Sequence, residues 1–176
     1  MTGASATERD DGYFMQIALS LARESRTDDV PVGAVVVVGG EIVGKGANQG
    51  RIRHDPTAHA EIVALRMAAE TLRNYRLPGS VLYVTLEPCF MCFGALLESR
   101  VSRLVFGARE PRMGVTGSLY DLHNDPRLTH RVDVVEGVHA EESTALLRKF
   151  FEKKRGRENG PKMRSVPSSP GSSSPQ

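Results

Sequence analysis

The 176-residue chain contains no tryptophan and only two cysteines, and these shortages narrow the kind of protein it can be. Two cysteines three positions apart cannot form the disulfide framework of a small secreted domain, so they indicate metal or redox chemistry in a reducing compartment. No apolar run approaches the roughly 20 residues that a membrane-spanning helix needs. The first eleven residues lack the basic start and apolar stretch of a signal peptide. We therefore expect a cytoplasmic protein without a membrane span.

The chain has little excess of either charge, with a formal net charge of +2, but its cations are unevenly distributed. Between Arg148 and Arg164 there are eight lysines or arginines and only two glutamates, a local excess of +6. Such a segment is suited to following a phosphate backbone. A solvated helix end, where cations complement the helix dipole, explains the same pattern. Charge alone does not decide between these two interpretations.

The spacing of apolar residues predicts an α/β protein in which helices and strands alternate. One folded domain is expected at 12–155, between an unstructured lead at 1–11 and an unstructured tail at 156–176 that is first basic and then rich in serine and proline. Strands separated by helices favour parallel neighbours with helices on both faces of the sheet. Helices are predicted at 12–25, 58–73, 89–99 and 141–154, and strands at 31–38, 41–47, 80–86, 103–108 and 131–136.

Two strand-to-helix turns contain the residues with the most distinctive chemistry. The first includes His59 and Glu61, and the second includes Cys89 and Cys92. The imidazole and two thiolates are suited to Zn²⁺, and three protein ligands leave a tetrahedral zinc with one position open for water, as in catalytic sites. Glu61 is not needed as a ligand and is placed to carry protons. The pattern His-x-Glu followed by Pro-Cys-x-x-Cys is typical of zinc-dependent nucleobase deaminases.

Two other interpretations of these turns belong to different functional classes. A Cys-x-x-Cys pair at the start of a helix is also found in thioredoxin-like redox proteins, although such a site has no use for His59 and Glu61. A zinc-dependent RNA-binding module without catalysis would contain the same ligands. Replacing Glu61 distinguishes these classes, because an enzyme loses turnover and keeps its zinc, whereas a binding protein is unaffected.

From about Tyr13 to Lys154 the sequence resembles the bacterial tRNA-specific adenosine deaminases of the cytidine-deaminase-like superfamily. The resemblance implies a three-layer α-β-α fold with a five-stranded mixed sheet and helices on both faces. The two zinc motifs alone are shared by deaminases of guanine, deoxycytidylate and riboflavin precursors, so a small-molecule guanine or cytosine-nucleotide deaminase is the alternative. The longer match that favours tRNA consists of residues 30–35, 53–61, 74–77, 82–89, 105–109 and 130–132.

The resemblance also implies a reaction, a cofactor and partners. His59, Cys89 and Cys92 would hold one Zn²⁺ per subunit, and Glu61 would shuttle protons. The substrate would be the wobble adenosine, position 34, of a tRNA anticodon loop, which is converted to inosine. The family is homodimeric, and the second subunit shapes part of the groove that receives the anticodon stem-loop.

A further set of residues matches family positions near the RNA. Glu110 stands where the family usually has an aspartate, and it keeps the acceptor on a side chain one methylene longer. Phe150 and Phe151 resemble an aromatic pair of which one ring approaches the RNA, and we expect at least one of the two in the core. The substrate-binding residues expected from the resemblance are Asn48, the backbone N–H of Ala60, His54, Glu110 and Phe151.

Overall fold

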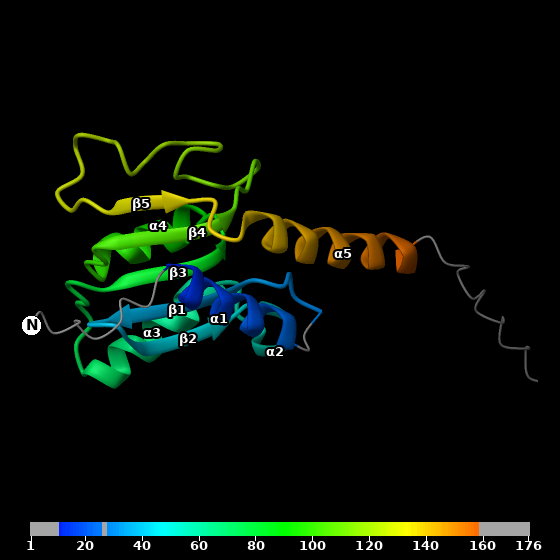
Figure 1. Ribbon diagram of the computed structural model, residues 1–176, viewed down its shortest axis with the longest axis horizontal. Helices are drawn as coiled ribbons and strands as arrows, with labels where there is room; N and C mark the ends of the chain where they lie inside the picture. The colour runs from blue at the N-terminus through cyan, green and yellow to red at the C-terminus, as the bar shows by residue number, and fades with distance from the viewer. Residues whose placement is uncertain (1–10, 26–27, 159–176) are drawn as a thin grey trace, which may run out of the picture.

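The structure, a computed structural model, describes residues 11–25 and 28–158, so most of the predicted lead and tail lie outside it (Figure 1). Each predicted helix and strand is present, with ends that differ by a few residues. Within the described ranges no helix combines the length and apolar character needed to cross a lipid bilayer. The helices are α1 (Asp11–Glu24), α2 (Gly50–Arg53), α3 (Ala60–Leu72), α4 (Phe90–Glu98) and α5 (Ala140–Glu158), and the strands are β1 (Gly33–Val38), β2 (Glu41–Ala47), β3 (Val81–Leu86), β4 (Arg103–Ala108) and β5 (Asp133–Glu136).

The strands form one mixed sheet in the order β2-β1-β3-β4-β5. β1 is antiparallel to both of its neighbours, whereas β3, β4 and β5 run parallel to one another. The β1–β2 hairpin turns at Gly39 and Gly40, whose φ angles of 58° and 81° suit glycine. The expected five-stranded mixed sheet is therefore confirmed.

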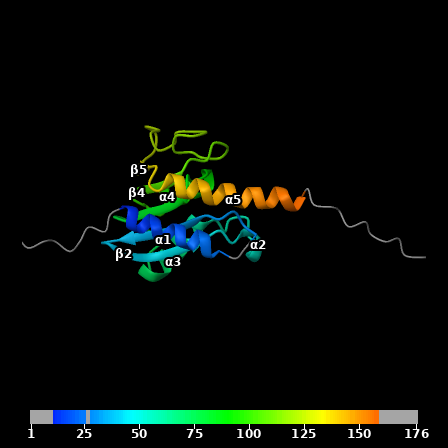
Figure 2. The ribbon, with the colours of Figure 1, turned by 45° about the vertical axis from the view of Figure 1, so that its right-hand side comes forward.

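Helices cover both faces of this sheet, which confirms the three-layer arrangement (Figures 1 and 2). Side chains alternate along each strand, so Leu82 and Val84 of β3 belong to the core cluster shared with α3 and α4. Tyr83 points to the opposite face and packs with Phe14 and other residues of α1. The helices α3 and α4 thus pack on the same face of the sheet.

The structure differs from the sequence-based expectation in one additional helix and in the ends of two others. A short helix, α2, lies in a segment predicted to be loop, because one turn with no buried residue has no apolar periodicity. Asp11 belongs to α1, and its carboxylate accepts hydrogen bonds from Arg103 at 2.8 and 2.7 Å. α5 continues to Glu158, three residues beyond the predicted end of the domain.

Two glycines of β2 allow α3 to lie directly against the sheet. A Cβ atom at Gly46 would stand 2.2 Å from the carbonyl oxygen of Ala60, and one at Gly44 would stand 2.2 Å from that of Ala64. Both obstacles are backbone atoms, so they cannot rotate away. Any side chain here pushes away the helix that begins at the first zinc motif.

We expect Gly46→Ala to lower the free energy of unfolding by about 3 kcal/mol, because overpacking costs about 1–3 kcal/mol and here the clash is with backbone. The melting temperature should fall by roughly 6–12 °C in a chain of this size. Gly94→Ala is the matched control: a Cβ there meets nothing within 4 Å in a helix, so it should be neutral or stabilising. Equal melting temperatures for Gly46→Ala and the wild type would show that α3 does not require this close contact.

Candidate metal centre and active site

The two zinc motifs occupy equivalent places, each at the residue before a helix. His59 is the N-cap of α3, with φ −72° and ψ 156°, and Cys89 is the N-cap of α4, with φ −82° and ψ 176°. Neither side chain caps its own helix, so the imidazole and the thiol are available to bind a metal ion. His59 thus lies just before the first turn, whereas the predicted helix began at Ala58. Both helices direct their positive N-terminal ends toward the same point.

The distances between the ligand atoms fit a tetrahedral zinc ion. Nδ1 of His59 lies 3.7 Å from Sγ of Cys89 and 3.5 Å from Sγ of Cys92. A zinc with bonds of about 2.3 Å to sulfur and 2.05 Å to nitrogen, at tetrahedral angles, places those atoms about 3.6 Å apart. The three atoms all lie within 4.8 Å of one another, and in the described part of the chain no other group of histidine, cysteine or acidic residues has this spacing. These residues fit Zn²⁺.

Glu61 is buried beside this cluster without being part of it. It is the second residue of α3 and its side chain is 4% exposed. Burial raises the pKa of its carboxyl group above the ordinary value. A carboxyl with a raised pKa is a stronger base than an ordinary glutamate, which favours a role as proton carrier.

The ligands themselves have strongly perturbed acidities in the metal-free protein. Hydrogen bonds from Cys92 and His59 lower the pKa of the Cys89 thiol to about 4, so Cys89 is a thiolate at neutral pH. The pKa of Cys92 is raised, first by its hydrogen bond to Cys89 and then by burial. The hydrogen bond between His59 and Cys89 raises the pKa of the His59 imidazole. One thiolate is therefore ready to bind a cation, and Cys92 retains its proton until one arrives.

A cavity of about 250 Å³, here called the metal cavity, opens over the cluster. Its wall is largely apolar, with a few polar groups that converge on the zinc ligands, as is common in sites for small molecules and bases. Glu61, His59 and Cys89 line it together with Asn48, Glu110 and Phe151. Three of the predicted metal-binding and catalytic residues and three of the predicted substrate-binding residues thus line the same cavity.

Asn48 and Ala60 contact each other. The side-chain oxygen of Asn48 accepts a hydrogen bond from the backbone N–H of Ala60 at 2.9 Å, and its amide nitrogen donates to the carbonyl of Val30 at 2.9 Å. In this structure Asn48 therefore fixes the start of α3 against the segment before β1. Contact of these two residues with the substrate stays a prediction.

Of His54, Phe150 and Phe151, only Phe151 lies at the metal cavity. His54 ends α2 in a left-handed conformation, with φ 51°, and lines an open hollow with Arg51 and Ile52 that is separate from the metal cavity. Phe151 lines the metal cavity, whereas Phe150 faces a different hollow. The expectation that at least one of these rings lies in the core is wrong, because both phenylalanines are only partly buried.

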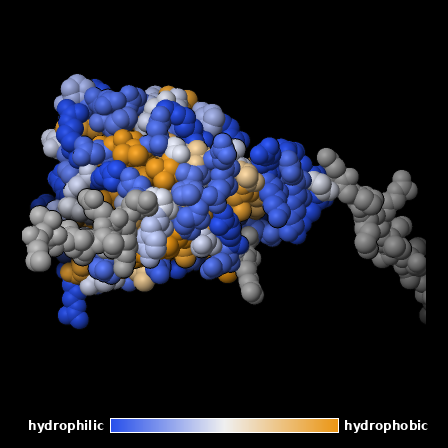
Figure 3. Space-filling view, in the orientation of Figure 1, coloured by the Kyte–Doolittle hydropathy of each residue, from blue (hydrophilic) through white to orange (hydrophobic). Residues whose placement is uncertain are grey.

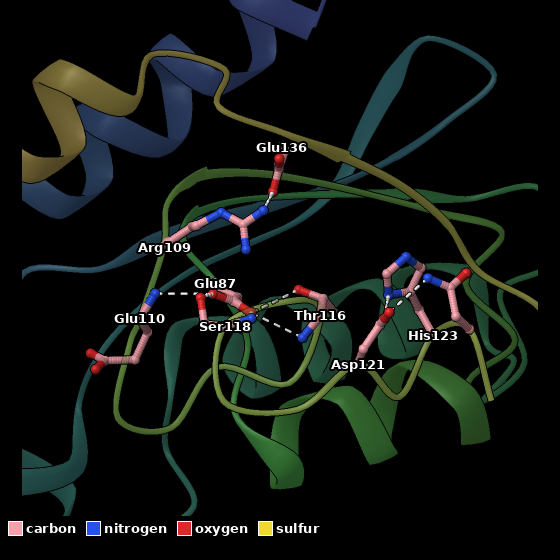
Figure 4. A network of polar contacts seen from close by, with 9 residues as sticks. Glu87, Arg109, Glu110, Thr116, Ser118, Asp121, His123 and Glu136 are labelled. Carbon is pink, nitrogen blue, oxygen red and sulfur yellow. Dashed lines mark hydrogen bonds and ion pairs between the residues drawn. The ribbon is translucent and has the colours of Figure 1, made fainter.

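Glu87 has a role that the sequence did not reveal. It is 3% exposed and accepts hydrogen bonds from the backbone N–H groups of Glu110, Thr116 and Ser118, at 3.0, 2.9 and 3.1 Å (Figure 4). The hydroxyls of Thr116 and Ser118 donate to the same carboxylate. Burial raises the pKa of Glu87, but these hydrogen bonds outweigh burial and lower it overall. One ionised carboxylate thus fixes the loop that brings Glu110 and Met113 to the metal cavity.

We expect Glu87→Gln to loosen this loop without removing the metal site. An amide NH₂ would face N–H donors, and losing a charged acceptor costs about 2 kcal/mol, which corresponds to about 30-fold faster opening. Hydrogen exchange at the backbone amides of Glu110, Thr116 and Ser118 measures this change. Glu136→Gln, which removes the exposed partner of Arg109 in the same view, is the control and should leave these amides unchanged. Unaltered exchange in Glu87→Gln would contradict the proposed role.

Comparisons with known proteins agree with this geometry. The family model for the zinc-binding region of cytidine and deoxycytidylate deaminases matches residues 8–108. The tRNA-specific adenosine deaminase of Haemophilus influenzae is 46% identical over 157 residues, which cover 88% of this chain and 91% of that protein. The enzyme of the same name from Bacillus subtilis is 40% identical over 146 residues, covering 82% and 91%.

Solved structures show the same relationship. A structure from studies of A-to-I editing by tRNA:A34 deaminases at the wobble position has a TM-score of 0.74 and 43% identity, covering 76% of this chain and 98% of that one. A guanine deaminase from Nitrosomonas europaea has a TM-score of 0.65 and 27% identity, covering 79% and 83%. Both the sequence relatives and the fold lead to one assignment: this chain belongs to the tRNA-specific adenosine deaminase family, within the zinc-binding cytidine and deoxycytidylate deaminases.

Proposed function

We propose that this protein converts the wobble adenosine, position 34, of tRNA anticodon loops to inosine by zinc-dependent hydrolysis. The observation that carries a deamination reaction is the buried carboxyl of Glu61 beside three ligand atoms at zinc spacing, all facing one cavity. The choice of tRNA rests on relatives of that name at 40–46% identity, whereas the guanine deaminase stands at 27%.

The proposed reaction adds water to C6 of the adenine and releases ammonia, so adenosine and water become inosine and ammonia. Zinc held by His59, Cys89 and Cys92 supplies the Lewis acidity that makes water a nucleophile at neutral pH. Glu61 takes a proton from the attacking water and transfers it to ring nitrogen N1. It then delivers the second proton to the departing amino group. The raised pKa of the Glu61 carboxyl suits both transfers.

The metal cavity suits a base that has left its stack. Single-stranded loops expose bases that a protein can draw into a pocket, which a duplex does not allow. The apolar wall, with Val30, Leu86 and Leu147, would cover the faces of the ring. Glu110 and Arg112 stand in the same lining on the loop fixed by Glu87, where they would meet the sugar and phosphate of the extruded nucleotide.

We also propose a cytoplasmic homodimer whose interface borders the metal cavity. Four large apolar side chains are 44–53% exposed, and one of them, Met113, lines the cavity. Exposed apolar side chains that gather in a patch are typical of a protein interface. Phe90, which follows the ligand Cys89, packs edge-on against Tyr120 with ring centroids 4.9 Å apart. Light scattering of the purified protein tests the dimer, and a monomer at working concentration would refute it. The four residues are Phe90, Met113, Leu119 and Tyr120.

The experiment that tests the function measures inosine formation on an anticodon stem-loop RNA with adenosine at the wobble position. The same zinc-loaded protein is given free guanine, cytidine and deoxycytidylate in parallel. We expect inosine in the stem-loop and no turnover of the small molecules. Deamination of guanine or a cytosine nucleotide without action on the stem-loop would replace this proposal by the small-molecule alternative.

A further inference from the structure

A second hollow, of about 350 Å³, lies where the segment after α1, the short helix α2 and the outer half of α5 meet. Its lining includes one acidic residue, one aromatic ring and four cations, and we call it the basic hollow. It is built from the part of α5 that extends past the sheet, where the surface is hydrophilic (Figures 1 and 3). The lining residues used below are Asp28, Arg51, Phe150, Lys153, Lys154 and Arg157.

The basic hollow adjoins the metal cavity. Phe150 lines the first and Phe151 lines the second, and their ring centroids are 5.3 Å apart at an interplanar angle of 78°. Two further segments contribute to both: Arg51 follows Asn48 by three residues, and Asp28 precedes Val30 by two. Because consecutive Cα atoms are about 3.8 Å apart, these pairs of lining residues lie within about 8–11 Å of each other, so the two sites are neighbours.

The cations of the basic hollow lack enough carboxylates to neutralise them. Arg157 lies 3.4 Å from Asp28, the one acidic residue in the lining. Within the described ranges, Lys153 and Lys154 form no salt bridge, and neither does the side chain of Arg51. The lining therefore has an excess of three positive charges.

Three of the four cations, all except Arg51, share one face of α5. Lys153 and Lys154 precede Arg157 by four and three residues, and Phe150 lies one turn earlier, so all four project to the same side. Like charges at these spacings repel each other and destabilise the helix. A multivalent anion between them would remove that repulsion, and an aromatic ring beside it offers a surface on which a base can stack.

We propose that the basic hollow binds the phosphates of the RNA strand immediately next to the nucleotide held in the metal cavity. This inference rests on the proposed function, because it gives an RNA substrate a second point of attachment. Phosphate oxygens would neutralise Lys153, Lys154 and Arg51, while the ring of Phe150 would face the adjoining base or sugar. The strand would then be fixed on one side of the extruded adenosine.

The test compares RNA binding by the charge-neutral double variant Lys153→Gln/Lys154→Gln with that of its parent. Both proteins are zinc-loaded and carry Glu61→Gln, so the stem-loop is not consumed, and binding is followed by fluorescence anisotropy at several salt concentrations. We expect about tenfold weaker binding. The slope of log K against log salt should fall by about 1.4, because each contact to a single strand contributes about 0.7.

Arg155→Gln is the matched control, because it removes one charge from the same helix at a position outside the lining. A second arm replaces the two phosphates next to the target adenosine, on the side of the basic hollow, by neutral methylphosphonates. The double variant should then bind this RNA as well as its parent does, whereas a methylphosphonate in the far strand of the stem should leave the difference intact.

The inference would be overturned, and the proposed function left standing, if Arg155→Gln lost as much affinity per charge removed as the double variant. It would also be overturned if the double variant still bound more weakly than its parent to the RNA with both methylphosphonates. Failure of the zinc-loaded parent to bind the stem-loop would overturn both. Zinc content is measured in every variant, and equal content excludes an indirect effect through the metal site.

Discussion

Glu61→Gln should lower kcat on the anticodon stem-loop by about 10²–10⁴-fold while leaving the zinc in place. General acid–base catalysis contributes on this order, and an amide of nearly the same shape cannot accept or deliver the protons. The side chain is 4% exposed and is not among the ligand atoms at zinc spacing, so the substitution preserves volume and leaves the ligands intact. Single-turnover kinetics together with zinc content per chain measure the two effects separately.

The control for this substitution is Glu110→Gln, which alters another carboxyl in the lining of the same cavity. The Glu110→Gln substitution should change KM only, because Glu110 lies on the loop fixed by Glu87 and not beside the zinc ligands. Retention of kcat within tenfold of the wild type by Glu61→Gln would show that another group carries the protons. The same experiment separates the functional classes that the motifs left open, because a binding module has no turnover to lose.

The sequence was sufficient to predict the layers and the metal site because both depend on local patterns. The helix that begins after Cys89 follows β3 closely, and the helix that begins after His59 is separated from β2 by the short helix α2. Their N-terminal residues nevertheless bring His59, Cys89 and Cys92 together. Valine-rich runs and apolar spacing identify such elements without knowledge of distant contacts. The short turn of α2, which buries no residue, has no such pattern and was missed.

The parts of the site that the sequence did not predict depend on long-range hydrogen bonds. Glu87 binds backbone groups 23–31 residues later in the chain, in a segment without helix or strand periodicity. Asn48 was expected at the substrate, and the structure shows that its side chain also connects Val30 to Ala60. A motif identifies residue types at fixed spacing, but it does not show which polar groups inside the protein they satisfy.

Cys92→Ser should abolish both zinc binding and deamination while leaving the fold intact. The side chain is fully buried at the third position of α4, and serine occupies nearly the same volume but is a poor zinc ligand. Loss of a partner that merely orients a ligand costs about 10–100-fold in metal affinity, so loss of a ligand should cost more. The main apolar core cluster contains none of the three zinc ligands, Cys92 included, so the circular dichroism spectrum of Cys92→Ser should remain native.

Zinc itself gives this prediction a measurement that does not depend on activity. A metal that binds only the native state at about 1,000 times its dissociation constant adds about 4 kcal/mol, so a chelator should lower the melting temperature of the wild type by on the order of 10 °C. Cys92→Ser should show no such shift. Because the raised pKa keeps Cys92 protonated in the metal-free protein, zinc binding must release that proton, and zinc affinity should fall as the pH is lowered. A chelator-sensitive melting temperature in Cys92→Ser would mean that another residue completes the site.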